Sequence, residues 1–142
     1  MDKKVKHNKI VLVGGCFDVL HPGHIFFLEK AKKMGDFLVV ILESDEKIKR
    51  IKGNNRPIYS QKERAVMLKA LNAVDKVVLL PFIDEEKEYD KVVGKIKPDI
   101  IATTQGDPSL THKQRTAKLT GAKLKIATRL IKDYSTTNIL AK

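Results

Sequence analysis

The feature that most constrains the fold is a buried-strand pattern that runs into a glycine pair and then into a helix start. Residues 10–13 (Ile-Val-Leu-Val) form an apolar, largely β-branched run, which is typical of a strand buried on both faces. Gly14 and Gly15 end the run, and glycines there let the backbone approach a ligand closely. Pro22 suits the first turn of a helix. The sequence therefore predicts a strand, a glycine turn and a helix N-terminus that can face a phosphate.

The helix that follows this turn is predicted to begin at Pro22 and to end at Gly35, a natural C-terminal cap. Apolar residues at helical spacing predict the face that packs on the sheet. These residues are Ile25, Phe26, Leu28 and Ala31.

Two histidines flank the start of the same helix. His21 and His24 are three residues apart, and Gly23 leaves the backbone between them uncovered. Imidazoles placed there can donate hydrogen bonds to phosphate oxygens as negative charge develops. A metal site is an alternative, but it needs further ligands, and His7 and His112 lie in polar surroundings. Surface histidines that merely cap a helix are a third interpretation, which the preceding glycine turn disfavours.

Strand and helix patterns alternate along the rest of the chain. Further strands are predicted at 37–42, 75–80, 98–104 and 123–130. Helices are predicted at 45–51, 60–72, 84–96 and 111–119. With no repeat or linker, this alternation predicts one domain over residues 1–142. Its fold class is α/β, a doubly wound parallel five-stranded sheet of Rossmann-like form, with ligands at the carboxyl ends of the strands.

The helix predicted at 60–72 begins with a capping box, Ser60-Gln61-Lys62-Glu63. Its core-facing residues are predicted from helical spacing as Val66, Met67, Ala70 and Leu71. Arg64 lies off this stripe, so the plain interpretation is a surface arginine.

The formal net charge of +11, from 28 Lys and Arg against 17 Asp and Glu, bears on the partners. Nucleic acid is one explanation, but the lysines are spread along the chain, without zinc-finger spacing or an RNA-recognition motif. Anionic small substrates and the Lys- and Ile-rich composition of proteins from hot environments explain the charge better. The single cysteine, Cys16, and the lack of a membrane-length apolar run lead us to expect a cytoplasmic protein with no membrane partner.

Residues 14–24, Gly-Gly-Cys-Phe-Asp-Val-Leu-His-Pro-Gly-His, resemble the HxGH signature of the cytidylyltransferase-like nucleotidyltransferases. Further similar segments follow in order at 55–58, 61–64, 71–75 and 134–139, so the resemblance covers essentially the whole chain. It implies the Rossmann-like nucleotidyltransferase fold. It also implies transfer of a nucleotidyl group from a nucleoside triphosphate to a phosphate monoester, with release of pyrophosphate.

The resemblance also implies site residues. The catalytic residues carried over are His21, His24, Lys52 and Arg64, with Arg56 as a further cation in the loop that closes over the phosphates in relatives. The nucleotide-binding residues carried over are Gly15, Cys16, Phe17, His21, Pro22, Gly23, His24, Gly106, Asp107, Tyr134, Ser135, Thr136 and Thr137. Cys16 is interpreted as pocket lining, because no base is placed beside it to make it a nucleophile. No protein metal ligand is implied, and Mg²⁺ or another divalent cation is expected with ATP.

The acceptor stays open between three families of relatives. FMN, the acceptor of archaeal-type FAD synthases in flavoprotein biosynthesis, is the first choice because the free-standing domain and the composition resemble those enzymes. Heptose-1-phosphate adenylyltransferases of lipopolysaccharide synthesis match residues 55–57 and 135–139 best, and glycerol-3-phosphate cytidylyltransferases are a third option. Adenylyl transfer from ATP is therefore expected over cytidylyl transfer. Relatives are often homodimers, and a nucleotide- or nucleic-acid-binding module without turnover is the non-enzyme alternative.

Overall fold

A computed structural model describes residues 8–129, in which strands and helices alternate. The elements are β1 (Ile10–Gly15), α1 (Pro22–Lys32), β2 (Phe37–Leu42), α2 (Asp45–Lys52), α3 (Gln61–Lys69), β3 (Lys76–Leu79), α4 (Glu86–Ile96), β4 (Ile100–Gln105), α5 (Leu110–Thr120) and β5 (Lys123–Arg129). These bounds confirm the predicted order of elements. The strand predicted at 10–13 is longer, because Gly14 and Gly15 still pair with β2.

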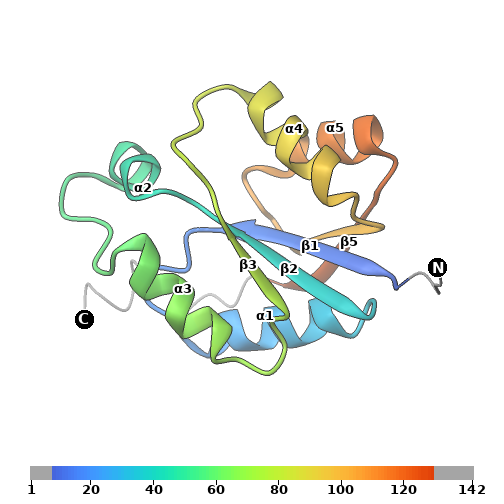
Figure 1. Ribbon diagram of the computed structural model, residues 1–142, viewed down its shortest axis with the longest axis horizontal. Coiled ribbons are helices and arrows are strands. Elements are labelled where there is room, and N and C mark those ends of the chain that lie inside the picture. The colour runs from blue at the N-terminus through green and yellow to red at the C-terminus, as the bar shows by residue number, and fades with distance from the viewer. Residues whose placement is uncertain (1–7, 130–142) are drawn as a thin grey trace.

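The sheet is parallel throughout these strands, and their order is β3-β2-β1-β4-β5 (Figure 1). Consecutive strands run outward from β1 to β3 on one side, and the chain then returns to place β4 and β5 on the other side. The strand order therefore reverses beside β1, which is the topological switch point where such sheets bind ligands. The predicted doubly wound, Rossmann-like fold is confirmed.

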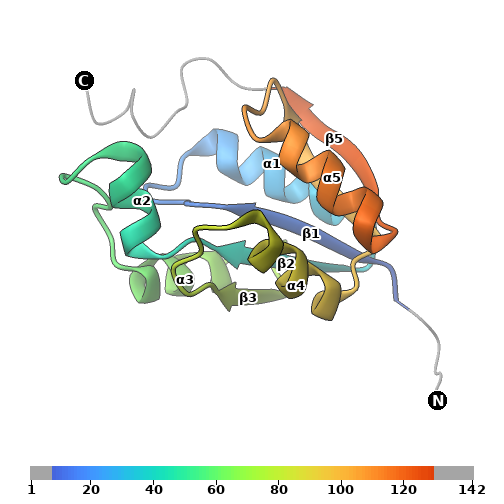
Figure 2. The ribbon, with the colours of Figure 1, turned by 90° about the horizontal axis from the view of Figure 1, so that it is seen from above.

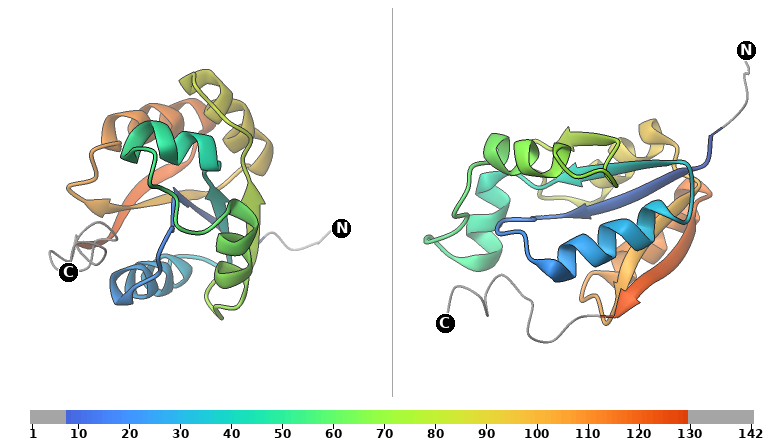
Figure 3. Two further views of the ribbon diagram at one scale, coloured as in Figure 1. Left: turned by 90° about the vertical axis from the view of Figure 1, so that its left-hand side faces the viewer. Right: turned by 90° about the horizontal axis from the view of Figure 1, so that it is seen from below.

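Helices cover both faces of the sheet (Figures 2 and 3). On one face, α1 and α3 bury Leu28 and Leu68 against strand residues such as Val11 and Val40. On the other face, α4 and α5 pack on the alternate strand residues, Leu12 and Ile101 among them. Because every strand residue near the centre meets a helix on its own face, the continuous apolar runs of β1 and β2 are explained. The remaining helix, α2, lies at the carboxyl end of the sheet (Figure 1).

The buried face and the end of α1 differ from the prediction. Phe27, Leu28 and Ala31 are buried, whereas Phe26 is 50% exposed, because the unbroken apolar run of residues 25–28 does not by itself define a face. The helix is capped at Lys33 and not at Gly35. Gly35 is needed for another reason: a Cβ there would lie 2.8 Å from the carbonyl oxygen of Lys9.

The buried face of α3 was also predicted wrongly. The capping box is present, since the Glu63 N–H donates to Ser60 Oγ and the Ser60 N–H donates to Glu63 Oε1. The buried residues of the helix are Arg64, Ala65 and Leu68, whereas Val66, placed in the core by the sequence pattern, is 68% exposed. The stripe therefore includes an arginine, which a search for apolar residues passes over.

Within residues 8–129, every helix falls short of the length and apolar character needed to cross a bilayer.

Candidate active site

The predicted site residues that the structure describes come from segments at the carboxyl edge of the sheet. Gly15 ends β1, Lys52 ends α2, and Gly106 and Asp107 follow β4. Because parallel strands end at the same edge, segments far apart in the sequence share this edge. The predicted nucleotide-binding residues Tyr134, Ser135, Thr136 and Thr137 lie outside the described residues.

The turn after β1 has a constrained backbone. Phe17 has a φ of +46°, a conformation that non-glycine residues adopt rarely and that gathers at functional sites. Its ring is buried and passes close to Gly15, where an added Cβ would come within 3.0 Å of the Phe17 ring. A larger residue at position 15 would crowd the Phe17 ring, so glycine suits this position.

The two histidines form the N-terminal cap of α1. The Gly23 N–H donates to His21 Nδ1 at 3.1 Å, and the His21 N–H donates to His24 Nδ1 at 3.2 Å. The two rings stack with their centroids 3.8 Å apart, and Pro22 occupies the first helical turn as predicted. Because each Nδ1 accepts a hydrogen bond, each neutral imidazole carries its proton on Nε2. The cap thus makes two adjacent Nε2–H donors.

Both imidazoles are neutral at pH 7. The pKa of His24 is lowered to about 4, chiefly by burial and to a smaller extent by the electrostatic effect of His21 and Lys52. Burial also lowers the pKa of His21. Lys52 is exposed, and its charge acts on Cys16 as well as on His24. The structure therefore brings Lys52, predicted as a catalytic cation, within electrostatic range of the histidine cap.

Arg64 lies where the sequence analysis did not place it. The residue is 0% exposed, so it is not a surface arginine. Its guanidinium donates to the carbonyls of Tyr59, Cys16 and Glu43 at 2.8–3.0 Å and to the carboxylate of Asp45 at 2.6 Å. With four hydrogen bonds inside the protein, Arg64 ties the glycine turn to the end of β2. The geometry makes it a positioning residue and not a group presented to a phosphate.

Arg56, expected as a loop cation over the phosphates, is also buried. It is 8% exposed, and its Nε donates to Asp18 Oδ2 at 2.9 Å. The Ile58 and Tyr59 N–H groups donate to the same carboxylate. Burial alone would raise the pKa of Asp18, but these hydrogen bonds outweigh it and the pKa is lowered. Arg56 therefore acts inside the fold, as the partner of Asp18.

Gly106 and Asp107 form a tight turn after β4. Gly106 has a φ of +81°, which favours glycine. The Asp107 carboxylate accepts hydrogen bonds from the Thr103 hydroxyl, the Lys113 ammonium and the Ser109 N–H. Burial would raise the pKa of Asp107, but these donors outweigh it and lower the pKa. The side chain of Asp107 thus stabilises the turn. The backbone of Gly106 is exposed, so it is the part of the turn that can contact a ligand.

The sequence profile of one family, described as cytidylyltransferase-like, matches residues 12–142. The chain belongs to the cytidylyltransferase-like family. It is a nucleotidyltransferase domain, as the resemblance in the sequence implied.

Relatives of this nucleotidyltransferase domain include a bifunctional protein, HldE. The chain is 44% identical to HldE of Helicobacter pylori strain J99 over 137 residues, which are 94% of this chain and 27% of that protein. It is 44% identical to HldE of Haemophilus influenzae strain PittGG over 98 residues, 69% of this chain and 20% of that protein. The chain therefore spans about a quarter of the length of such relatives.

Solved structures agree with the fold of the family. The lipopolysaccharide core biosynthesis protein of Thermoplasma volcanium has a TM-score of 0.67 and 33% identity, covering 88% of this chain and 98% of that one. The pantothenate synthetase of Thermus thermophilus has a TM-score of 0.57 at 14% identity, covering 84% of this chain and 55% of that one, and it is similar in fold alone.

Sequence reasoning missed two residues at the edge of this nucleotidyltransferase site. The Tyr89 hydroxyl donates to the Glu43 carboxylate, with oxygen distances of 2.8 and 3.0 Å. Glu43 directly follows the buried strand β2, and a polar residue at that position could have been singled out from the sequence. Tyr89 lies 46 residues further on, in α4, and no local pattern connects it to Glu43.

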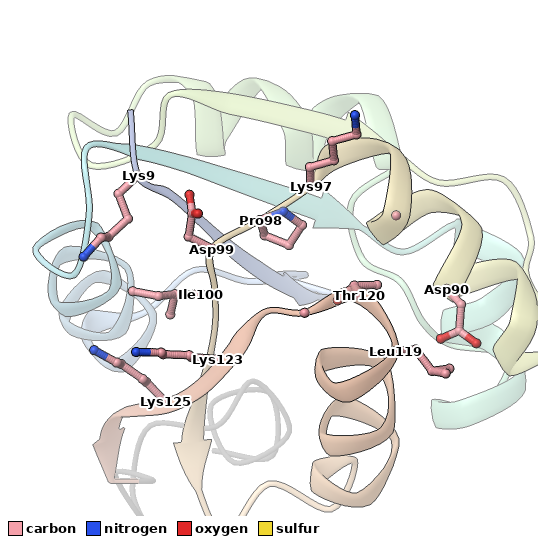
Figure 4. Close-up of a pocket in the computed structure, with 12 residues that line it drawn as sticks. Lys9, Asp90, Lys97, Pro98, Asp99, Ile100, Leu119, Thr120, Lys123 and Lys125 are labelled. Atoms are coloured by element: carbon pink, nitrogen blue, oxygen red, sulfur yellow. The ribbon is translucent and has the colours of Figure 1, made fainter. Parts of the chain in front are cut away.

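A groove of about 860 Å³ lies elsewhere, at the amino ends of β1, β4 and β5 (Figure 4). Lysines are prominent in its lining: Lys9, Lys97, Lys123 and Lys125. The groove contains none of the predicted site residues, and the amino ends of parallel strands are not where this fold class binds ligands. We therefore locate the candidate active site at the histidine cap and not in this groove.

Proposed function

We propose that this chain transfers AMP from ATP to D-glycero-D-manno-heptose 1-phosphate and releases pyrophosphate. The observation that carries the proposal is the 44% identity to HldE over 94% of the chain. The Thermoplasma lipopolysaccharide core biosynthesis protein, at 33% identity, supports the same acceptor class. These relatives favour the heptose acceptor, which the sequence analysis kept as an alternative, over FMN, its first choice.

In the proposed reaction an oxygen of the acceptor phosphate attacks the α-phosphorus of ATP in line. The new P–O bond forms as the bond to the β-phosphate breaks, and pyrophosphate leaves with the electron pair. The Nε2–H groups of His21 and His24 donate to the α-phosphoryl oxygens as negative charge develops there. No covalent intermediate on the protein is needed, which agrees with Cys16, whose thiol pKa is raised, chiefly by burial.

The neutral histidines supply hydrogen bonds but no positive charge, so we assign the charge at the leaving phosphates to Lys52 and to the metal of MgATP. Within residues 8–129, no group of three or more His, Cys, Asp or Glu side chains could hold a metal ion. Mg²⁺ is commonly bound through the phosphates of the nucleotide, so it enters here as part of the substrate. Ser135, Thr136 and Thr137 remain predicted nucleotide-binding residues, and we propose that they contact the leaving phosphates.

The experiment that tests the proposal is pyrophosphate release with ATP or CTP against heptose 1-phosphate, FMN and glycerol 3-phosphate. We expect turnover with ATP and heptose 1-phosphate. Turnover with ATP and FMN alone would show that the acceptor is FMN and not heptose 1-phosphate, while adenylyl transfer would stand. Turnover with none of the pairs, together with salt-sensitive binding to an oligonucleotide, would favour the binding-module alternative.

A further inference from the structure

Glu43 is a partly buried carboxylate at the carboxyl edge of the sheet that the proposed reaction does not use. It is the first residue after β2, and its N–H donates to the carbonyl oxygen of Gly15 at 3.1 Å. This hydrogen bond places Glu43 beside the glycine turn of β1. Burial raises the pKa of Glu43, and the hydrogen bond from Tyr89 opposes that shift.

The surroundings of Glu43 belong to the candidate site. The charges of Lys52 and Glu43 both act on the thiol of Cys16, and Lys52 also acts on His24. Glu43 therefore lies near Cys16, as Lys52 does, beside the turn that leads to the histidine cap. It lies on the β2 side of β1, whereas Gly106, the predicted nucleotide contact, lies on the β4 side.

The carboxylate keeps hydrogen-bonding capacity that the protein does not use. Among residues 8–129, Tyr89 is the side chain that donates to it. The neighbouring cations form hydrogen bonds to backbone carbonyl groups and not to this carboxylate. Lys47 Nζ donates to the carbonyl of Ile83, and Arg64 donates to the backbone carbonyl of Glu43. A carboxylate has about four acceptor positions. The Tyr89 hydroxyl is shared between the two carboxylate oxygens, so acceptor positions remain for a ligand. Glu43 is only partly buried, so a ligand can reach it.

The chemistry of a carboxylate selects the ligand group it can meet. Negative charge is unfavourable beside the phosphates of ATP or of the acceptor, whereas sugar hydroxyls donate well to a carboxylate. We propose that Glu43, held in place by Tyr89, is a specificity-determining residue that binds hydroxyl groups of the acceptor sugar phosphate on the β2 side of the site. The inference rests on the proposed function, because it names the part of the heptose that the protein recognises.

The test compares KM values for the two substrates in Glu43→Gln and Tyr89→Phe variants. Glu43→Gln keeps the size of the side chain but loses the charge and one acceptor oxygen. We expect its KM for heptose 1-phosphate to rise about tenfold or more, with KM for ATP changed less than about twofold. Tyr89→Phe removes the hydroxyl that donates to the Glu43 carboxylate, and we expect it to give a smaller rise in KM for heptose 1-phosphate. Glu46→Gln is the matched control, because Glu46 is an exposed glutamate on α2.

A second measurement separates hydroxyl recognition from a structural effect. Deoxy analogues of the acceptor are expected to bind wild-type protein more weakly but to lose little further affinity in Glu43→Gln, measured calorimetrically with a non-hydrolysable ATP analogue. If wild-type protein uses heptose 1-phosphate and Glu43→Gln has unchanged KM values, or a raised KM for ATP alone, the inference is overturned and the proposed function stands. Wild-type protein that neither binds nor adenylylates heptose 1-phosphate overturns both.

Discussion

The carboxylate of Asp18 accepts a hydrogen bond from Arg56 Nε at 2.9 Å, and this buried pair joins the turn after β1 to the loop between α2 and α3. The N–H groups of Ile58 and Tyr59 donate to the same carboxylate. Arg56 Nη2 is buried and has no hydrogen-bond partner in the part of the chain described. The charge of Arg56 is therefore compensated chiefly by Asp18.

Removing Asp18 should destabilise the fold strongly. We expect Asp18→Ala to lower the free energy of unfolding by about 3–5 kcal/mol, because it leaves a guanidinium buried without its partner and two loop N–H groups without an acceptor. Urea unfolding followed by circular dichroism measures the change. Asp84→Ala, at an exposed aspartate, is the control and should stay within about 0.5 kcal/mol of wild type. A loss below about 1 kcal/mol for Asp18→Ala would show that the loop does not depend on the pair.

Arg64 should respond as a structural residue. Arg64→Lys keeps the charge but cannot reproduce four hydrogen bonds in three directions, so we expect a loss of about 2–4 kcal/mol in unfolding free energy. Thermal and urea unfolding give the value, and Lys62→Ala, exposed on the same helix, serves as the control. An Arg64→Lys variant with wild-type stability and a large loss of kcat would instead support the catalytic role that the sequence resemblance implied.

The fold was predictable because its strands are unambiguous in the sequence. The predicted bounds of β2 are the observed ones, since a continuous apolar run of that length flanked by polar residues fits a buried strand. Helix faces were less predictable. Apolar spacing could not reveal that Arg64 occupies a core position of α3, because its burial depends on carbonyl groups supplied by other segments.

The site was predictable where one short segment contains it. The spacing of His21 and His24 predicted that both lie at the start of the helix, and the structure adds their stacking and the lowering of both pKa values. The Glu43–Tyr89 pair was not predictable, because its two residues meet only when α4 packs beside the end of β2. Local patterns thus identify segments, and the tertiary fold decides which side chains face one another.

The histidine cap should be needed for catalysis. We expect His24→Ala to lower kcat about 10²–10³-fold, the usual loss for one donor to a developing oxyanion. The same change removes the acceptor for the His21 N–H, so a loss of about 1 kcal/mol in stability should accompany it. His112→Ala, at an exposed histidine on α5, should change neither quantity. Undiminished kcat in His24→Ala would remove the cap from the mechanism.

The low pKa of His24 gives stability a defined pH dependence. In the unfolded chain the imidazole of His24 has its ordinary pKa of 6.5, whereas in the folded protein this pKa is about 4. The unfolded state therefore binds more protons between these values, and stability falls as the pH drops from about 6.5 to 4. Between pH 6.5 and 4 we expect the free energy of unfolding to fall on the order of 1–3 kcal/mol more in wild-type protein than in His24→Gln. Urea unfolding at several pH values measures the difference. Parallel profiles for the two proteins would contradict the low pKa.

Lys52 should act through its charge and not through the fold. It is exposed at the end of α2, just before Gly53, whose φ of +100° turns the chain into the following loop. With both histidines neutral, Lys52 is the described cation whose charge acts on His24, so it is well placed to attract the triphosphate. We expect Lys52→Ala to lower kcat/KM for ATP about tenfold or more, with unfolding free energy changed by less than about 0.5 kcal/mol.

The salt dependence of the same variant distinguishes attraction of the substrate from an indirect effect. Wild-type kcat/KM should fall as ionic strength rises, because salt screens an exposed charge, and Lys52→Ala should fall less steeply. Lys49→Ala removes another exposed lysine from α2 and controls for the net charge of the protein. If Lys49→Ala and Lys52→Ala lose activity to the same extent, the general positive charge attracts ATP, and Lys52 has no particular place at the phosphates.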